Sequence, residues 1–290
     1  MKKYYFLSFA FIFLYSSLFF AQEVCIVYQK GTPLFEETAE ITKMALNPKS
    51  FIPVEKEKEE EAKTAISIEK DSLMVLCGPN AITVAFQSGV EKGVAMGLPN
   101  PLSKVYSTKN DFSFVTLFPE PKIIFEFLNK FYSPKTVGLI YTTTVNQEMA
   151  DYFKRLIEQS GFKCKTLGVN SAQELVSPFP FFLSQVDVAL ILIDPLAYNK
   201  EAVKFMVTKA IEKKKPIIGF SEQVPSAGIP LAIYVDPKLL SETIAKAVKE
   251  QKAGTNSLLY FSSSFKLSIN EEACKIIGVR YDESKVAKKF

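Results

Sequence analysis

The chain has 290 residues, of which 48% are hydrophobic and 13% aromatic, enough to build one large or two modest cores. Its net charge of +4 at pH 7 is small and its lysines are scattered among acids, which excludes a nucleic-acid-binding protein. Histidine is absent, so Ser-His-Asp and Cys-His nucleophiles and the commonest zinc ligand are excluded. Arginine, the usual bidentate clamp for carboxylates, occurs only as Arg155 and Arg280. This composition predicts a protein that is not an enzyme and needs no metal or cofactor.

The first 22 residues carry a targeting signal. The segment MKKYYFLSFAFIFLYSSLFFAQ places a lysine pair before an uncharged apolar stretch, the plan of a secretory signal peptide. Phe19 is large where a small residue is preferred near the cleavage site, and the apolar run is long enough to be an uncleaved membrane anchor. We expect residues 1–22 to be a signal peptide, with an N-terminal anchor as the alternative. Both place the body of the protein in the periplasm or another extracytoplasmic space.

The rest of the chain alternates strand-like and helix-like segments in two successive units. In the first unit we expect strands at residues 24–29, 51–54, 72–77 and 93–96, and helices at 34–46, 56–70 and from about 81. The second unit begins near residue 119, with helices expected at 121–131, 147–159, 172–183 and 200–211 and strands at 136–141, 162–169, 188–193 and 216–220. A last helix at 237–251 precedes a tail from 258. The alternation predicts parallel sheets with right-handed crossovers.

The expected strands end in polar or turn-forming residues, and open parallel sheets bind their ligands at the carboxyl ends of their strands. Two such units in series predict a cleft between two lobes, lined by these ends. The candidate ligand-binding residues are Tyr28, Gln29, Gly78, Pro79, Asn80, Thr142, Thr143, Thr144, Asp194, Ser221 and Glu222.

Two kinds of ligand contact are expected there. The turns after Cys77 and Tyr141 each lead into a helix N-terminus, whose free N–H groups and dipole attract an anion such as a ligand carboxylate. Asp194 and Glu222 could meet an ammonium group. Each residue is equally well explained as a turn or helix-cap residue. A hydrolytic pair of Asp194 and Glu222 is a further alternative, but the lack of a supporting base or metal motif favours binding.

Four cysteines are present, Cys25, Cys77, Cys164 and Cys274, and their spacing resembles no metal site. An extracytoplasmic protein can form disulfides. Cys25 and Cys77 are the best candidate pair, because the first and third strands of such a sheet are neighbours. The interpretation we favour is nevertheless four small buried side chains.

Three segments of the second unit resemble a known family. They read KTVGLIYTTTVNQEMADYFKRLIEQSGFKCKTLGVNSAQEL, VDVALILIDPLAYN and KPIIGFSE. In this order they resemble the second lobe of ABC-transporter substrate-binding proteins with the type I periplasmic-binding fold. The nearest group is often associated with tryptophan and other aromatic amino acids. In the resemblance Asp194 matches an acid at a strand end, and Ser221-Glu222 match a second polar pair.

The resemblance extends to the end of the chain. The tail FKLSINEEACKIIGVRYDESKVAKKF matches the family ending, with Asn270, Ala273 and Gly278 in register. The match covers about residues 119–290 well and the first unit weakly. The sequence departs from the family after the third strand, where CGPNAI replaces a threonine turn, and at Ser241, which replaces a glycine.

The resemblance implies an α/β fold with two Rossmann-like lobes, whose parallel sheets are joined by a three-segment hinge. The first lobe would contain residues 23–118 plus about 235–258, and the second 119–234 plus about 259–290. The expected function is that of an extracytoplasmic solute-binding protein. As a monomer, it would bind a small polar or amphipathic ligand, such as an amino acid, and deliver it to an ABC permease in the membrane. The alternative is a degenerate binding-fold protein that acts through protein contacts, in a sensor or envelope complex, without transport.

Overall fold

A computed structural model describes residues 23–106 and 111–290 of the chain. The signal peptide or anchor predicted for residues 1–22 lies outside these ranges. Within them, no helix is both long and apolar enough to cross a bilayer.

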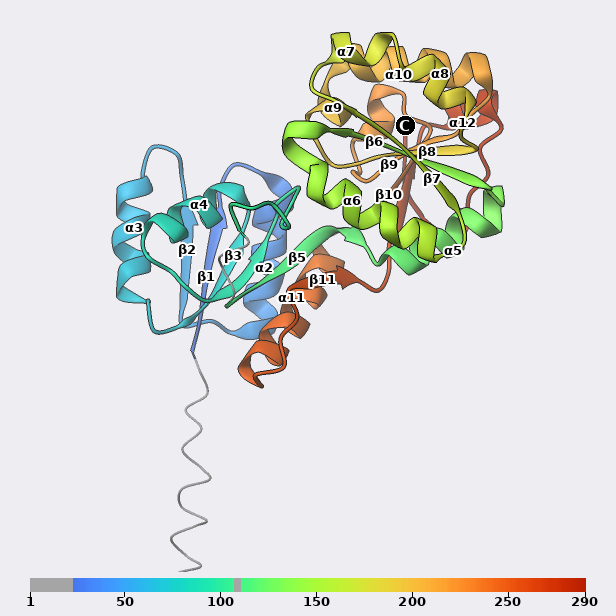
Figure 1. Cartoon of the computed structure of the whole chain (residues 1–290). Coiled ribbons are helices and arrows are strands. Elements are labelled where there is room, and N and C mark those ends of the chain that lie inside the picture. The colour runs from blue at the N-terminus through green and yellow to red at the C-terminus, as the bar shows by residue number, and fades with distance from the viewer. Residues whose placement is uncertain (1–22, 107–110) are drawn as a thin grey trace, which may run out of the picture.

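The described chain forms two α/β lobes, each built on its own sheet (Figure 1). The first sheet is entirely parallel and has the strand order β11-β5-β4-β3-β1-β2. Its strands are β1 (Val24–Gln29), β2 (Ser50–Val54), β3 (Leu73–Cys77), β4 (Gly93–Met96), β5 (Phe112–Pro119) and β11 (Leu259–Ser262). The second sheet has the order β13-β12-β10-β9-β8-β6-β7 and is parallel except where β12 pairs with β10. Its strands are β6 (Thr136–Thr142), β7 (Lys163–Val169), β8 (Val188–Ile191), β9 (Ile217–Gly219), β10 (Leu231–Tyr234), β12 (Lys266–Ile269) and β13 (Val286–Lys289). The expected α/β fold class is confirmed.

Helices cover both faces of the first sheet. Helices α2 (Pro33–Leu46) and α11 (Pro237–Lys252) pack on one face, where Ala39 and Ile244 join the apolar side chains of β1 and β3. Helices α3 (Glu59–Ile68) and α4 (Pro79–Gln87) pack on the other. Because strands covered on both faces need apolar side chains at every position, β3 reads LMVLC without alternation.

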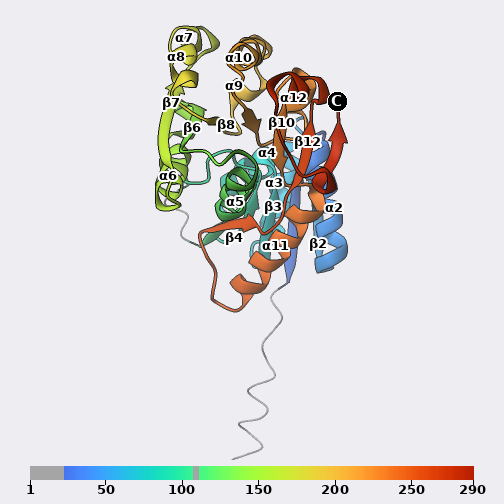
Figure 2. The same ribbon diagram turned by 90° about the vertical axis from the view of Figure 1, so that its right-hand side faces the viewer.

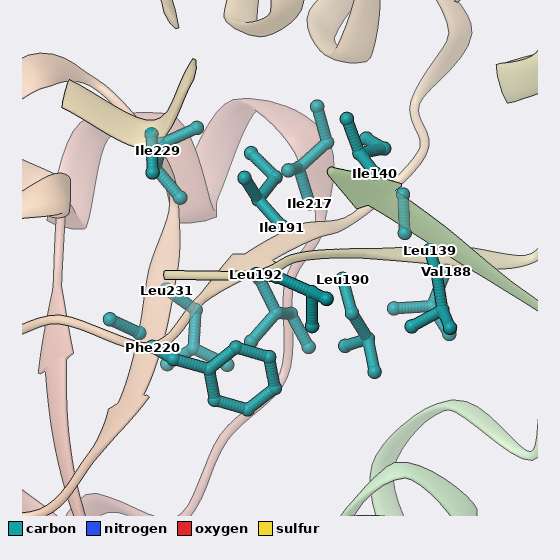
Figure 3. Packing of buried hydrophobic residues seen from close by; sticks show 14 of the residues in the cluster. Leu139, Ile140, Val188, Leu190, Ile191, Leu192, Ile217, Phe220, Ile229 and Leu231 are labelled. Carbon is teal, nitrogen blue, oxygen red and sulfur yellow. The ribbon is translucent and has the colours of Figure 1, made fainter. Parts of the chain in front are cut away.

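The second lobe is organised in the same way around a larger core. Its helices are α5 (Pro121–Tyr132), α6 (Thr143–Gln159), α7 (Ala172–Val176), α8 (Phe179–Ser184), α9 (Pro195–Tyr198), α10 (Lys200–Lys213) and α12 (Glu271–Ile277). Figure 3 shows side chains alternating along β8 and the residue after it, with Ile191 on one side and Leu190 and Leu192 on the other. All three are buried, as the uninterrupted apolar run of this strand predicts.

The chain passes between the sheets three times, after β5, after β10 and after β11. As a result α11, although late in the sequence, lies with the first lobe beside α2 (Figures 1 and 2). Strand β11 is the edge of the first sheet, so the last passage follows Ser262.

Two elements differ from the sequence-based expectation. The single helix expected at 172–183 is broken into α7 and α8 at Ser177-Pro178, because Pro178 has no N–H to continue the hydrogen-bond ladder of α7. Strand β5 was not expected at all. Its run FSFVTLFP joins β4 to the edge strand β11, a partner from the far end of the chain.

The candidate disulfide between Cys25 and Cys77 is wrong. Cys25 lies opposite Met74 in the ladder of β1 and β3, whereas Cys77 lies opposite Tyr28, so the two are offset by three positions. Because side chains alternate along a strand, an odd offset places the two thiols on opposite faces of the sheet, in separate core clusters. Cys25, Cys77 and Cys274 are buried free thiols, and Cys164 is free but only half-buried. Burial, the largest effect, raises the pKa of both Cys25 and Cys77 to about 12.

Candidate ligand-binding site

A cavity of about 350 Å³ lies between the two lobes. It is lined by residues from the start of α2, from β5, and from the segments that follow β8, β9 and β10. These lining residues are Thr32, Pro33, Leu34, Glu37, Leu117, Ile193, Tyr198, Phe220, Ser221, Glu222, Gln223, Tyr234, Val235, Asp236 and Pro237.

The topology brings these segments together. Strands β8, β9 and β10 are adjacent and parallel, so their carboxyl ends meet at one edge of the second sheet. The segment after β1, which opens α2, supplies the wall from the first lobe, and the segment after β10 passes between the lobes into α11. The cavity therefore lies at the strand-end edge where an open α/β sheet holds a ligand.

Three carboxylates line the cavity, and two of them already have a cationic partner. Lys288 Nζ lies 3.2 Å from Glu222 Oε1, and Lys266 Nζ lies 3.0 Å from Asp236 Oδ2. Glu37 is exposed and forms no ion pair within residues 23–106 and 111–290. No lysine or arginine belongs to the described lining. The three carboxylates and two lysine partners leave an excess of one negative charge at the cavity.

Two tyrosines give the cavity an aromatic surface with polar ends. Tyr234 exposes only 6% of its surface. Burial and then the nearby carboxylates of Glu222 and Asp236 raise the pKa of its phenol to about 12. The hydroxyl is therefore neutral at physiological pH, and it makes no hydrogen bond to any other described side chain or backbone group. Tyr198, at the end of α9, exposes 56% of its surface.

Of the residues expected from the sequence, Ser221 and Glu222 line the cavity. Asp194 lies just behind the lining and is 3% exposed. Its Oδ2 accepts a hydrogen bond from Thr142 N at 2.6 Å, and its Oδ1 accepts one from Leu196 N at 2.8 Å as the N-cap of α9. Burial raises the pKa of this carboxyl, against the lowering effect of the two backbone bonds. The carboxylate of Asp194 thus holds the turn between β8 and α9 and fastens it to the end of β6.

The two helix N-termini expected to attract an anion are partly occupied by the chain's own side chains. Gln29 Oε1 accepts a hydrogen bond from Asn80 N at 2.9 Å in the first turn of α4. Asn170 Oδ1 accepts one from Thr144 N at 3.1 Å in the first turn of α6. These amide oxygens take the place of a ligand anion at one N–H of each helix.

The other expected site residues do not belong to the described cavity lining. Tyr28 stacks on Phe51 with ring centroids 4.5 Å apart. Gly78 has φ of 104°, and a Cβ there would lie 2.7 Å from Gln29 Cβ, so the turn after β3 requires glycine. Pro79 begins α4, and Thr143 packs against Gly168.

Sequence reasoning missed Thr32, Glu37, Tyr198, Tyr234 and Asp236, all of which line the cavity. A repeated signal could have found the last two. The segments LILIDP and AIYVDP both end an apolar strand with Asp-Pro, and in both the aspartate caps the following helix. Asp194 in the first copy is buried behind the lining, whereas Asp236 in the second faces the cavity.

A second contact joins the lobes outside the described cavity. Asn100, which follows β4 and is 4% exposed, donates from Nδ2 to Val145 O and to Glu148 Oε2, both at 2.8 Å. Both acceptors belong to α6 of the second lobe. The Oδ1 of Asn100 is buried without a hydrogen-bond partner. Apart from the chain passages, this side chain is a direct polar link between the lobes.

The family model described as "ABC transporter substrate binding protein" matches residues 124–289, more than half of the chain. The chain belongs to this family. Its members are binding proteins and not enzymes, which agrees with the expectation drawn from composition. No group of three or more candidate ligands for a metal ion occurs in the part of the chain that the structure describes. No curated protein matches the sequence.

Solved structures of substrate-binding proteins have the same fold. The ligand-free, open structure of CD0873 from Clostridium difficile, a substrate-binding protein with adhesive properties, is 16% identical with a TM-score of 0.67, over 92% of this chain and 98% of that one. An ABC domain from Streptococcus pneumonia in complex with L-Trp is 15% identical with a TM-score of 0.57, over 93% and 100%. The leucine-binding protein LivK from Thermotoga maritima is 13% identical with a TM-score of 0.51, over 80% and 86%. These likenesses confirm the type I periplasmic-binding fold.

Proposed function

We propose that this protein is the extracytoplasmic solute-binding component of an ABC transporter. It holds a small amphipathic ligand in the cavity between its lobes and delivers it to a membrane permease. Family membership supports the role, and the predicted signal peptide or anchor at residues 1–22 supports the location.

The observation that best supports the proposal is that both lobes contribute residues to the walls of the cavity. Thr32 to Glu37 belong to the first lobe, Tyr198 and Phe220 to the second, and Leu117 and Val235 lie at chain passages. A volume of about 350 Å³ falls at the lower end of the roughly 300–1,000 Å³ of small-molecule sites. The lining is mostly apolar and aromatic and also contains six polar or charged side chains, three of them carboxylates.

The same geometry suggests how binding changes the protein. A ligand held between the lobes contacts both walls only when they are close, so it favours the closed arrangement by its differential affinity. The three passages between the sheets are the segments about which the lobes would turn. Closure would bury the ligand and present a surface to the permease that differs from the ligand-free surface.

Titration calorimetry of residues 23–290 against amino acids, amines and small organic acids tests the proposal. We expect at least one compound to bind, and Tyr198→Ala to weaken that binding by about tenfold, because a partly exposed aromatic wall contributes roughly 1–2 kcal/mol. Phe181→Ala on α8 is the matched control, since Phe181 is exposed by 71% and does not belong to the described lining.

Equal weakening by both variants would show that the cavity is not the site. An absence of heat and of thermal stabilisation from every compound would count against transport. It would favour the alternative in which this fold acts through protein contacts.

A further inference from the structure

We propose that the ligand is a cationic amphipathic amine without a carboxylate group. This inference rests on the proposed function, because it names the class of solute that the cavity between the lobes takes. It departs from the expectation of an amino acid, whose carboxylate would need a partner in the site.

The charges of the cavity favour a cation. Glu37, Glu222 and Asp236 line it, and the lysines that partner the last two lie outside the described lining. Glu37, on the wall formed by α2, has no cationic partner among the described residues. A ligand ammonium would supply the missing positive charge, whereas a ligand carboxylate would face three carboxylates and no lining cation.

The helix ends at the cavity offer little to an anion. Helices α2 and α11 both begin at the lining, but each carries a carboxylate of its own at that end. Glu36 lies in the first turn of α2, and its Oε1 accepts from Gly31 N, which precedes the helix, at 2.6 Å. Asp236 Oδ1 accepts from Leu239 N in the first turn of α11 at 2.9 Å. These carboxylates already complement the positive ends of the two helix dipoles.

The remaining lining fits an apolar or aromatic body with one more polar contact. Leu117, Ile193 and Phe220 are apolar, and Tyr198 adds an aromatic face. The unpartnered hydroxyl of Tyr234 can accept a hydrogen bond from an ammonium group, and its pKa of about 12 keeps it protonated. This hydroxyl is not among the buried polar atoms that lack a partner, so it reaches solvent, and a ligand ammonium would take the place of water there. Cation-π attraction to the tyrosine rings acts in the same direction.

Calorimetry with three probes that share a phenyl group separates the possibilities. Phenethylamine carries only an ammonium, phenylalanine carries an ammonium and a carboxylate, and phenylacetate carries only a carboxylate. We expect phenethylamine to bind most tightly and its affinity to fall with added salt, because the attraction is electrostatic and partly exposed. Glu37→Gln should weaken it by about threefold or more. Glu40→Gln, on the same helix but outside the described lining, should leave it unchanged.

Each other result overturns the inference in a distinguishable way. Tighter binding of phenylalanine or phenylacetate would leave the solute-binding function standing and refute the amine. An unchanged affinity in Glu37→Gln would refute the role of the cavity charge. If none of the probes binds, a native mass spectrum of protein purified gently from cells decides. A retained carboxylate refutes the amine alone, and an empty protein counts against both the amine and the solute-binding function.

Discussion

The neighbouring strands β8 and β9 are each followed by an acidic residue, but one of these residues is buried and the other lines the cavity. Asp194 follows β8, is 3% exposed, and bonds with both oxygens to backbone N–H groups of its own chain. Glu222 follows β9, lines the cavity, and pairs with Lys288 across a partly exposed surface. The sequence places both at the carboxyl end of an apolar run, so the run does not reveal which acid faces a ligand.

The difference arises from what lies around each carboxylate. The backbone N–H groups of Thr142 and Leu196 converge on Asp194, because β6 is adjacent to β8 and α9 begins directly after the acid. No backbone N–H bonds to the Glu222 side chain in the described structure. Asp194 therefore has a structural role, because the following helix and the neighbouring strand both donate N–H groups to it. Glu222 receives no such bonds from the described residues, so its carboxylate remains available to a ligand.

Among the substitutions that test this difference between the two acids, we expect Asp194→Ala to change the free energy of unfolding most. The substitution leaves two buried N–H groups without an acceptor and removes a helix cap, so we expect a loss of about 3 kcal/mol in the free energy of unfolding. Urea unfolding of residues 23–290 measures it. Asp194→Asn keeps one acceptor oxygen for the cap and should lose clearly less.

If Asp194→Ala unfolds at the wild-type urea concentration but fails to bind a ligand, the structural role assigned to Asp194 is wrong. Asp194 would then be a ligand-binding residue, as its match to the family's strand-end acid implies.

A smaller effect is expected from Asn100→Ala, which removes the polar link between the lobes. Two hydrogen bonds to α6 are lost, and the buried Oδ1 without a partner is lost with them. The net change in unfolding free energy should be about 1 kcal/mol. The radius of gyration of the ligand-free protein, measured by small-angle X-ray scattering, should increase because the lobes lose a contact.

Glu148→Gln is the control for this link, since its amide oxygen can still accept the bond from Asn100 Nδ2. An unchanged radius of gyration in Asn100→Ala would show that this side chain is not needed to hold the lobes in place.

The smallest change in stability is expected from Glu222→Gln. Its ion pair with Lys288 is about 40% exposed on both sides, and such pairs contribute about 0–1 kcal/mol. Thermal unfolding should therefore stay within about 0.5 kcal/mol of wild type, while the affinity for a bound amine falls. A large loss of stability would show that Glu222 is a structural acid like Asp194.

Local patterns in the sequence determined most of the secondary structure of both lobes. Continuous apolar runs such as that of β8 predict strands covered on both faces, and segments with one apolar side predict the helices between them. Residues whose partner is distant in the sequence escaped this reasoning. Strand β5 depends on β11 from the end of the chain, and α11 packs on a sheet completed long before it.

The binding site was determined by the sequence only in part. Composition without histidine and with two arginines excludes nucleophile–histidine chemistry and makes arginine clamps scarce, and the order of segments indicates the family. Tertiary structure decided which of these side chains meet. The register of β1 and β3 separates Cys25 from Cys77, and the turn after β8 encloses Asp194. The chain passages bring Glu37, Tyr198, Tyr234 and Asp236 to one cavity, because neighbours across two sheets are set by packing and not by spacing along the chain.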